Sequence, residues 1–239
     1  MCKNILFTVC ARAGSKGVQG KNVRELCGKP IVYYTLDVYK EFAEKHKEMN
    51  VILAVNTDSE LLIKQINQYE IDYIWVERKE ELAGDTVGKA DVIIDTLFQV
   101  EEKLSRIFDV VIDLDLTSPL RKLEDIEGTL NLILENKQCN FAYSVVEARR
   151  NPYFNMVCIK ENGFYDRVIA SEFTARQQVP KCYDMNASVY AYARDYLLDN
   201  SKENRRALIW IMEDNGILDI DSEKDFEMMQ AILKHYKEK

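Results

Sequence analysis

The chain has 239 residues, of which 47% are hydrophobic and 30% are charged, and its formal net charge is −8. This composition is typical of a folded soluble protein, and the acidity argues against nucleic acid or an anionic membrane as a partner. No run approaches the roughly 20 apolar residues of a membrane span and the first residues lack the profile of a signal peptide, so we expect a cytoplasmic protein.

A glycine-bearing loop follows the first predicted strand. Residues 5–10 read Ile-Leu-Phe-Thr-Val-Cys, a mostly apolar run that predicts a buried strand. Residues 11–22 read Ala-Arg-Ala-Gly-Ser-Lys-Gly-Val-Gln-Gly-Lys-Asn, and a helix is expected from Pro30. A strand, such a loop and a helix direct backbone N–H groups toward phosphate. The side chains that can bind an anion there are those of Arg12, Ser15, Lys16, Lys21 and Asn22.

The spacing of this loop differs from that of two known phosphate-binding motifs. Five residues separate Gly14 from Gly20, and Lys21 precedes Asn22, whereas a P-loop has four residues between its glycines and ends in Lys-Ser or Lys-Thr. The even spacing of the glycines also differs from G-x-G-x-x-G. A solvated basic turn is an equal alternative on spacing alone. Charge favours an anion site, because the first 36 residues hold six Lys or Arg and one acid, Glu25.

Short apolar runs then alternate with amphipathic segments. We expect strands at 51–55, 72–76 and 108–114. We expect helices at 30–48, from the end of the 51–55 strand to residue 69, at 89–104 and at 123–135. Thr57 and Glu60 are expected to form a capping box for the second helix. This alternation predicts βαβ units in an α/β fold with a doubly wound, mostly parallel sheet. Ligands bind such sheets beyond the carboxyl ends of the strands, where the loops 11–22, 56–59, 77–88 and 115–121 lie.

Two acidic segments are further candidates for a site. Residues 113–121 read Asp-Leu-Asp-Leu-Thr-Ser-Pro-Leu-Arg, and an acidic strand end is costly to bury for packing alone. Residues 219–221 read Asp-Ile-Asp, so both carboxylates point to one side of an extended segment, before a helix with a predicted Ser222-x-x-Asp225 cap. Two carboxylates on one face suit magnesium. Helix capping is the alternative for Asp221.

The pattern changes between residues 140 and 186. Strand-like pieces at 141–147, 154–159 and 164–170 replace the alternation, with turn signals between them. We expect residues 1–139 and 187–239 to form the α/β domain, and residues 140–186 to form a β-rich excursion from it. Such an element cannot bury both faces within its own chain, so it predicts a homodimer. Three arginines lie in this segment, Arg149, Arg150 and Arg176. They either serve a binding site or are plain surface charge.

These motifs resemble those of the CMP-sialic acid synthetases, the cytidylyltransferases of nine-carbon acidic sugars. The resemblance rests on residues 11–17 with Lys21-Asn22 and 28–31, on 78–85, on 113–121, on 176–183, on 186–192 and on the final acid pair. Cys10 and Ala13 depart from the usual proline and glycine. Asp115 stands where the sialic acid enzymes carry glutamine, and this aspartate-rich version resembles the legionaminic acid branch.

The resemblance implies a Rossmann-like nucleotidyltransferase fold whose excursion is a dimerisation element, and a magnesium-dependent attack of a nonulosonic acid on CTP that releases pyrophosphate. A legionaminic-type acid is the first choice of sugar and sialic acid the second. The implied roles are nucleotide binding by Arg12, Ser15, Lys16, Lys21, Asn22, Arg78 and Asp85, with Arg12, Lys16 and Lys21 catalytic; sugar binding by Asp115, Arg176 and Asn186; and magnesium binding by Asp219 and Asp221.

Several alternatives stay open at this point. A catalytically silent nucleotide-binding regulator and a cytidylyltransferase for another 2-keto acid sugar, such as Kdo, are the other candidate functions. Asp115 can bind either metal or sugar, since a carboxylate serves both. The sequence identifies neither the general base, nor the N-acyl pattern of the sugar, nor which of the three arginines acts across a dimer.

Overall fold

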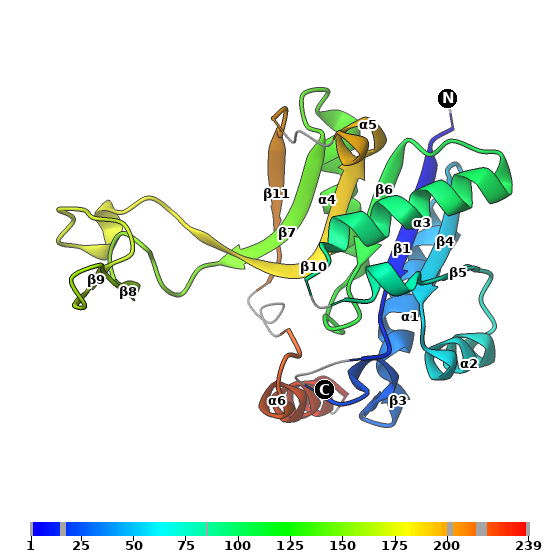
Figure 1. Cartoon of the computed structure of the whole chain (residues 1–239), viewed down its shortest axis with the longest axis horizontal. Coiled ribbons are helices and arrows are strands. Elements are labelled where there is room, and N and C mark those ends of the chain that lie inside the picture. The colour runs from blue at the N-terminus through cyan, green and yellow to red at the C-terminus, as the bar shows by residue number, and fades with distance from the viewer. Residues whose placement is uncertain (1, 15–17, 85, 200–202, 214–218, 238–239) are drawn as a thin grey trace.

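A seven-stranded sheet lies at the centre of the computed structural model, which describes residues 2–14, 18–84, 86–199, 203–213 and 219–237 (Figure 1). Its strand order is β11-β7-β10-β6-β1-β4-β5. All neighbours are parallel except β10, which runs antiparallel to both β6 and β7. The predicted mostly parallel sheet is therefore confirmed. The strands are β1 (Asn4–Cys10), β4 (Asn50–Thr57), β5 (Ile74–Glu77), β6 (Val110–Leu114), β7 (Phe141–Glu147), β10 (Tyr183–Ala193) and β11 (Ala207–Ile211).

Helices cover both faces of the sheet. Successive side chains of a strand point to opposite faces, and in β1 both faces carry apolar side chains. Ile5, Phe7 and Val9 of β1 pack on the side of α1 (Ile31–Lys45), α2 (Glu60–Tyr69) and α4 (Leu123–Glu135). Leu6 points the other way, toward α3 (Lys89–Leu104) and α5 (Arg194–Leu198). The central strands are thus buried on both sides, and the predicted doubly wound α/β architecture is confirmed.

Most helices lie where the sequence predicts them, and those at 89–104 and 123–135 have the expected ends. The cap of α2 differs from the prediction. Ser59 is its N-cap, with its Oγ accepting a hydrogen bond from the Leu62 N–H at 3.2 Å. The predicted Thr57–Glu60 capping box is wrong because β4 continues through Thr57. Among the described residues, no helix has the length and apolar character needed to cross a bilayer.

The last described helix, α6 (Glu223–Lys237), packs against a small hairpin near the other end of the sequence. The hairpin consists of β2 (Glu25–Leu26) and β3 (Lys29–Pro30), and it follows a short 3-10 helix, η1 (Lys21–Val23). Arg24, which lies just before the hairpin, contacts α6. Its Nη1 lies 2.6 Å from Glu223, and its guanidinium lies 3.8 Å from the ring centre of Phe226. The predicted cap is confirmed, with Ser222 Oγ accepting from the Asp225 N–H at 3.2 Å. Residues 219–221 are thereby held beside η1, where Lys21 donates to the carbonyl of Ile220, and Figure 1 shows α6 next to the hairpin strand β3.

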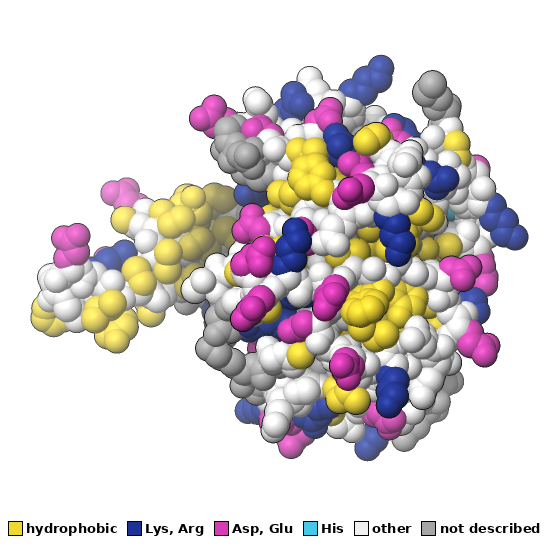
Figure 2. All heavy atoms as spheres, turned by 45° about the vertical axis from the view of Figure 1, so that its right-hand side comes forward, with side chains coloured by type: hydrophobic (Ala, Val, Ile, Leu, Met, Phe, Trp, Pro, Cys, Tyr) yellow, Lys and Arg dark blue, Asp and Glu magenta, His cyan; other side chains and the backbone are white. Residues whose placement is uncertain are grey.

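Residues 148–182 leave the sheet between β7 and β10 and form a projecting arm (Figure 1). The arm contains β8 (Val157–Ile159), β9 (Tyr165–Arg167) and a 3-10 helix, η3 (Arg176–Gln178). The expected boundaries 140–186 are too wide, because residues 141–147 and 183–186 belong to strands of the central sheet. Figure 2 shows apolar side chains gathered on the arm, where Val157, Ile159, Phe164 and Tyr165 are each at least 60% exposed.

Candidate active site

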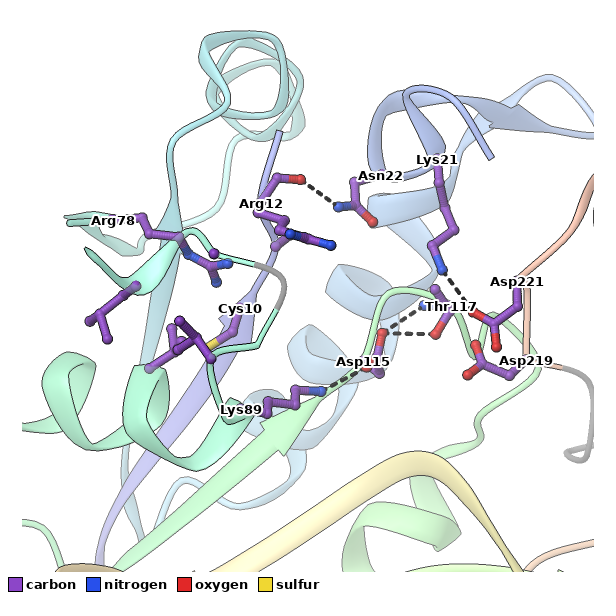
Figure 3. Close-up of a pocket in the computed structure, with 15 residues that line it drawn as sticks. Cys10, Arg12, Lys21, Asn22, Arg78, Lys89, Asp115, Thr117, Asp219 and Asp221 are labelled. Atoms are coloured by element: carbon purple, nitrogen blue, oxygen red, sulfur yellow. Dashed lines mark hydrogen bonds and ion pairs between the residues drawn. The ribbon is translucent and has the colours of Figure 1, made fainter. Parts of the chain in front are cut away.

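A cavity of about 430 Å³ opens beyond the carboxyl ends of β1 and β6 (Figure 3). From β1 the chain proceeds to β4 and β5 on one side and then crosses to β6 on the other. Such a switch point leaves a crevice outside the strand ends, which is where open α/β sheets bind ligands. The residues that line it are Cys10, Ala11, Arg12, Lys21, Asn22, Arg78, Leu82, Gly84, Val87, Lys89, Val92, Asp115, Thr117, Asp219 and Asp221.

The loop after β1 is fastened to its neighbours on both sides of residues 15–17. Ala13 donates its backbone N–H to Asp58 Oδ1 at 2.7 Å. Asn22 donates from Nδ2 to the carbonyl of Arg12 at 3.0 Å, and the Arg12 guanidinium donates to the carbonyl of Ala83 at 3.2 Å. Arg12 and Asn22 therefore reach the cavity from a loop whose ends are fixed. The predicted residues Ser15, Lys16 and Asp85 lie outside the described part of the chain.

Lys21 and the final acid pair meet at one end of the cavity (Figure 3). Lys21 Nζ donates to the carbonyl of Ile220 at 2.6 Å and lies 3.3 Å from Asp221 Oδ1. Asp219 is hydrogen-bonded to Thr117, yet its Oδ1 is buried without a hydrogen-bond partner among the described residues. Burial raises the pKa of Asp219 above its ordinary value. This end combines a cation with an unsatisfied carboxylate oxygen.

Arg78 and several apolar side chains form the other end. Arg78 is buried, and its Nε donates to Asn56 Oδ1 at 2.9 Å, so β4 fixes its guanidinium. Burial lowers the pKa of Arg78 and raises the pKa of the adjacent Cys10 thiol. Leu82 and Val87 add apolar surface to the same wall. A partly apolar wall with a fixed guanidinium suits a flat, neutral ring with hydrogen-bond acceptors.

Lys89, which the sequence analysis missed, lies on the floor of the cavity between these ends (Figure 3). Its Nζ is 2.7 Å from Asp113 Oδ2 and 2.7 Å from Asp115 Oδ2. Burial alone lowers the pKa of Lys89, but the two carboxylates outweigh it and raise that pKa well above its usual value. Asp113 is fully buried and accepts from Thr8 Oγ1 at 2.8 Å. One signal was available, because a lysine at the first position of a helix opposes the helix dipole and needs a carboxylate partner.

Asp115 has protein partners on both carboxylate oxygens. Its Oδ2 faces Lys89, and its Oδ1 accepts from Thr117 Oγ1 at 2.8 Å and from the Thr117 N–H at 3.2 Å. Burial would raise the pKa of Asp115, but the Lys89 ammonium holds it well below its usual range. Arg121, from the same motif, is buried against the Ser188 carbonyl at 3.1 Å, and burial lowers its pKa to about 10. Arg121 therefore supports the loop and does not line the cavity.

Two predicted sugar-binding residues lie away from the cavity of their own chain. Asn186 is buried in the sheet, where its Oδ1 accepts from Ser144 Oγ at 2.7 Å and its Nδ2 lies 3.0 Å from Met212 Sδ. Arg176 lies in η3 on the arm. The structure thus brings together seven of the predicted residues, namely Arg12, Lys21, Asn22, Arg78, Asp115, Asp219 and Asp221, and it leaves Arg176 and Asn186 apart.

The crevice at a switch point, with cations and an acid pair at one end, suits a phosphorylated ligand in an α/β fold, and the family match identifies the class as a nucleotidyltransferase. The chain belongs to the cytidylyltransferase family, whose sequence profile matches residues 6–235. It is 36% identical over 233 residues to the CMP-N,N'-diacetyllegionaminic acid synthase of Campylobacter jejuni, covering 96% of this chain and 94% of that one. It is 37% identical over 231 residues to the post-translational flagellin modification protein B of Campylobacter coli, covering 96% and 95%.

A solved structure shares the fold at low sequence identity. A CMP-2-keto-3-deoxy-manno-octonic acid synthetase, determined in complex with CTP, superposes with a TM-score of 0.68 at 16% identity, covering 98% of this chain and all of the other. This likeness concerns the fold alone, and it agrees with the predicted Rossmann-like nucleotidyltransferase architecture.

Proposed function

We propose that this cytidylyltransferase activates a nonulosonic acid, transferring CMP from CTP to its anomeric hydroxyl and releasing pyrophosphate. The observation that carries the proposal is the 36% identity, over almost the whole of both chains, to a CMP-N,N'-diacetyllegionaminic acid synthase. The aspartate at position 115 also favours a legionaminic-type acid, and sialic acid is the second choice. Because CTP is an intracellular metabolite, we propose a cytoplasmic location.

The nucleotide is proposed to lie along the cavity with its base at the Arg78 end. The fixed guanidinium of Arg78 and the apolar surface of Leu82 and Val87 suit a pyrimidine ring. The triphosphate then lies toward Arg12 and Lys21, whose charges and fixed positions would neutralise the departing pyrophosphate. Asn22 faces the same space and can hydrogen-bond the nucleotide. Ser15 and Lys16 complete the proposed triphosphate loop, and Asp85 is proposed beside the base.

Magnesium is the proposed cofactor, and the acid pair fits it. The buried Asp219 Oδ1 has no hydrogen-bond partner among the described residues, which is the state expected of an oxygen that awaits a cation. Asp221 supplies a second, exposed carboxylate on the same segment, while magnesium usually keeps water and phosphate oxygens as its other ligands. When bound, the metal would stabilise charge on the phosphates. Lys21 would be released from Asp221 toward those phosphates.

A homodimer through the arm is part of the proposal. The arm exposes apolar side chains on a two-stranded hairpin, and such a hairpin is marginally stable unless something packs against it. A second copy that covers this surface could also carry Arg176 to the neighbouring active site, since Arg176 is distant from the cavity of its own chain. Arg149 and Arg150 lie at the base of the arm and are the alternatives for this role.

The direct test is pyrophosphate release from CTP with a panel of nonulosonic acids that differ in their N-acyl groups. We expect the fastest turnover with a legionaminic-type acid and a strict need for magnesium. Turnover only with Kdo would mean that the substrate is another 2-keto acid sugar and not a nonulosonic acid. CTP binding without pyrophosphate release from any acid would favour the nucleotide-binding regulator, which the retained acid pair disfavours.

A further inference from the structure

Lys89, Asp113 and Asp115 form a charged cluster on the floor of the cavity (Figure 3). Asp113 and Asp115 are two residues apart at the end of β6, so both point toward α3, whose first residue is Lys89. Buried carboxylates are costly, and a lysine is unfavourable at the start of a helix. Each charge is therefore stabilised by the others. For helix packing alone, an apolar residue at position 89 would serve at least as well as a lysine, so packing does not explain Lys89.

The position of Lys89 decides which ligands Asp115 can accept. An ammonium nitrogen 2.7 Å from Asp115 Oδ2 repels a divalent cation from that oxygen, and the hydroxyl and the N–H of Thr117 both donate to Oδ1. Oδ2 still has a second lone pair for a neutral donor. The Asp115 side chain is 27% exposed and lines the cavity. A sugar hydroxyl group fits this carboxylate, and magnesium does not.

We propose that Lys89 is a positioning residue of the reaction: it orients Asp115 to accept a hydroxyl group of the acid sugar and keeps Asp115 out of the magnesium site. This inference rests on the proposed function, because the sugar is the ligand that Asp115 would bind. Thr117 extends the arrangement, since it contacts both Asp115 and Asp219. The cluster thereby links the sugar side of the cavity to the acid pair.

The first test is a double-mutant cycle of Lys89→Met and Asp115→Asn, followed by pyrophosphate release. Each single change should raise the KM for the acid sugar by about 10- to 100-fold and the KM for CTP by less than about threefold. Because Lys89 acts through Asp115, the double variant should be no worse than Asp115→Asn alone. Additive losses, or a rise mainly in the KM for CTP, would mean that Lys89 contacts the nucleotide itself and would overturn the proposal.

Two further variants separate positioning from a general effect on the fold. Lys89→Arg keeps a cation between the carboxylates and should retain the KM for the sugar within a few-fold. Lys3→Met breaks an exposed 3.3 Å ion pair with Asp109, just before the other end of β6, and should leave all kinetic constants unchanged. If Lys89→Met does not fold because Asp113 is left buried without its cation, the same cycle is measured in an Asp113→Asn background, where the comparison with Asp115→Asn decides the question.

The second test measures metal binding without turnover. Mn²⁺ is titrated by electron paramagnetic resonance in the presence of CTP and without sugar. Asp115→Asn should leave the Kd for Mn²⁺ within about twofold of wild type, whereas Asp219→Asn should weaken it by about tenfold or more. Weakened Mn²⁺ binding by Asp115→Asn would place Asp115 in the metal site and overturn the inference. Failure of the wild-type protein to use any nonulosonic acid would instead overturn the proposed function.

Discussion

Asp219→Asn should lower turnover and at the same time stabilise the metal-free protein. The change keeps the shape of the side chain and removes its charge. Losing a carboxylate ligand removes several kcal/mol of charge stabilisation in the transition state, and about 4 kcal/mol corresponds to roughly 10³-fold in kcat. The fold should remain intact, because the carboxylate that is lost has an oxygen with no hydrogen-bond partner among the described residues.

The gain in stability follows from the direction of the pKa shift. Burial raises the pKa of Asp219 in the folded protein, so the folded state holds this proton more tightly than the unfolded state. The stabilisation of the folded state by protonated Asp219 is present at acidic pH, and it is lost as the pH rises through the pKa that Asp219 has in the folded protein. Near neutral pH the ionised, unpaired oxygen costs about 1 kcal/mol, the low end of the range because the residue is only half-buried.

Thermal unfolding in the presence of a chelator measures this effect. For a chain of this size, about 1 kcal/mol shifts Tm by about 2–4 °C, so Asp219→Asn should melt higher than wild type near neutral pH and by less at acidic pH. Asp221→Asn is the matched control, since that side chain is 76% exposed: turnover should fall and Tm should stay the same. Near wild-type activity of both variants at saturating magnesium would refute the metal assignment, and an unchanged Tm for Asp219→Asn would refute the argument from burial.

Three other predictions concern the loop, the arm and the packing of α4. Lys21→Ala should lower kcat by about 10²-fold or more while CTP binding survives better, and a raised KM at unchanged kcat would contradict this. A mixed dimer of Arg176→Ala and Lys21→Ala subunits should regain up to about half of wild-type activity, because one composite site is intact; no recovery, or a fully active monomer, would exclude the shared site. Gly128→Ala should lower Tm by about 2–12 °C, because its Cβ would lie 2.3 Å from Trp210 Cε3 and overpacking costs about 1–3 kcal/mol; an unchanged Tm would contradict the packing of α4 on β11.

The central sheet could be predicted because its signal is local. Buried parallel strands are continuous apolar runs, and the helices between them show their own periodicity, so both could be found by inspection. Strand partners and directions are not local properties. The sequence analysis therefore missed β11 altogether and did not indicate that β10 runs antiparallel between β7 and β6.

The same distinction applies to the candidate site. Arg12, Lys21 and Asp115 follow predicted strands at the carboxyl edge of the sheet, so the topology alone brings them together. Lys89 was missed because its role depends on Asp115, 26 residues further along the chain. Asn186 was assigned by resemblance to a motif, but the sheet uses its amide for contacts with Ser144 and Met212.

The contact between Lys21 and residues 219–221 has a consequence for synthesis of the protein. Lys21 and Asp221 are 200 positions apart, so the loop emerges long before the segment that completes its site. At translation rates of about 5–20 residues per second, the interval is about 10–40 s. During that time the nascent chain has the basic loop but neither the acid pair nor α6. A ribosome-bound chain that stops before residue 219 should therefore be unable to transfer CMP, even if its sheet has already formed.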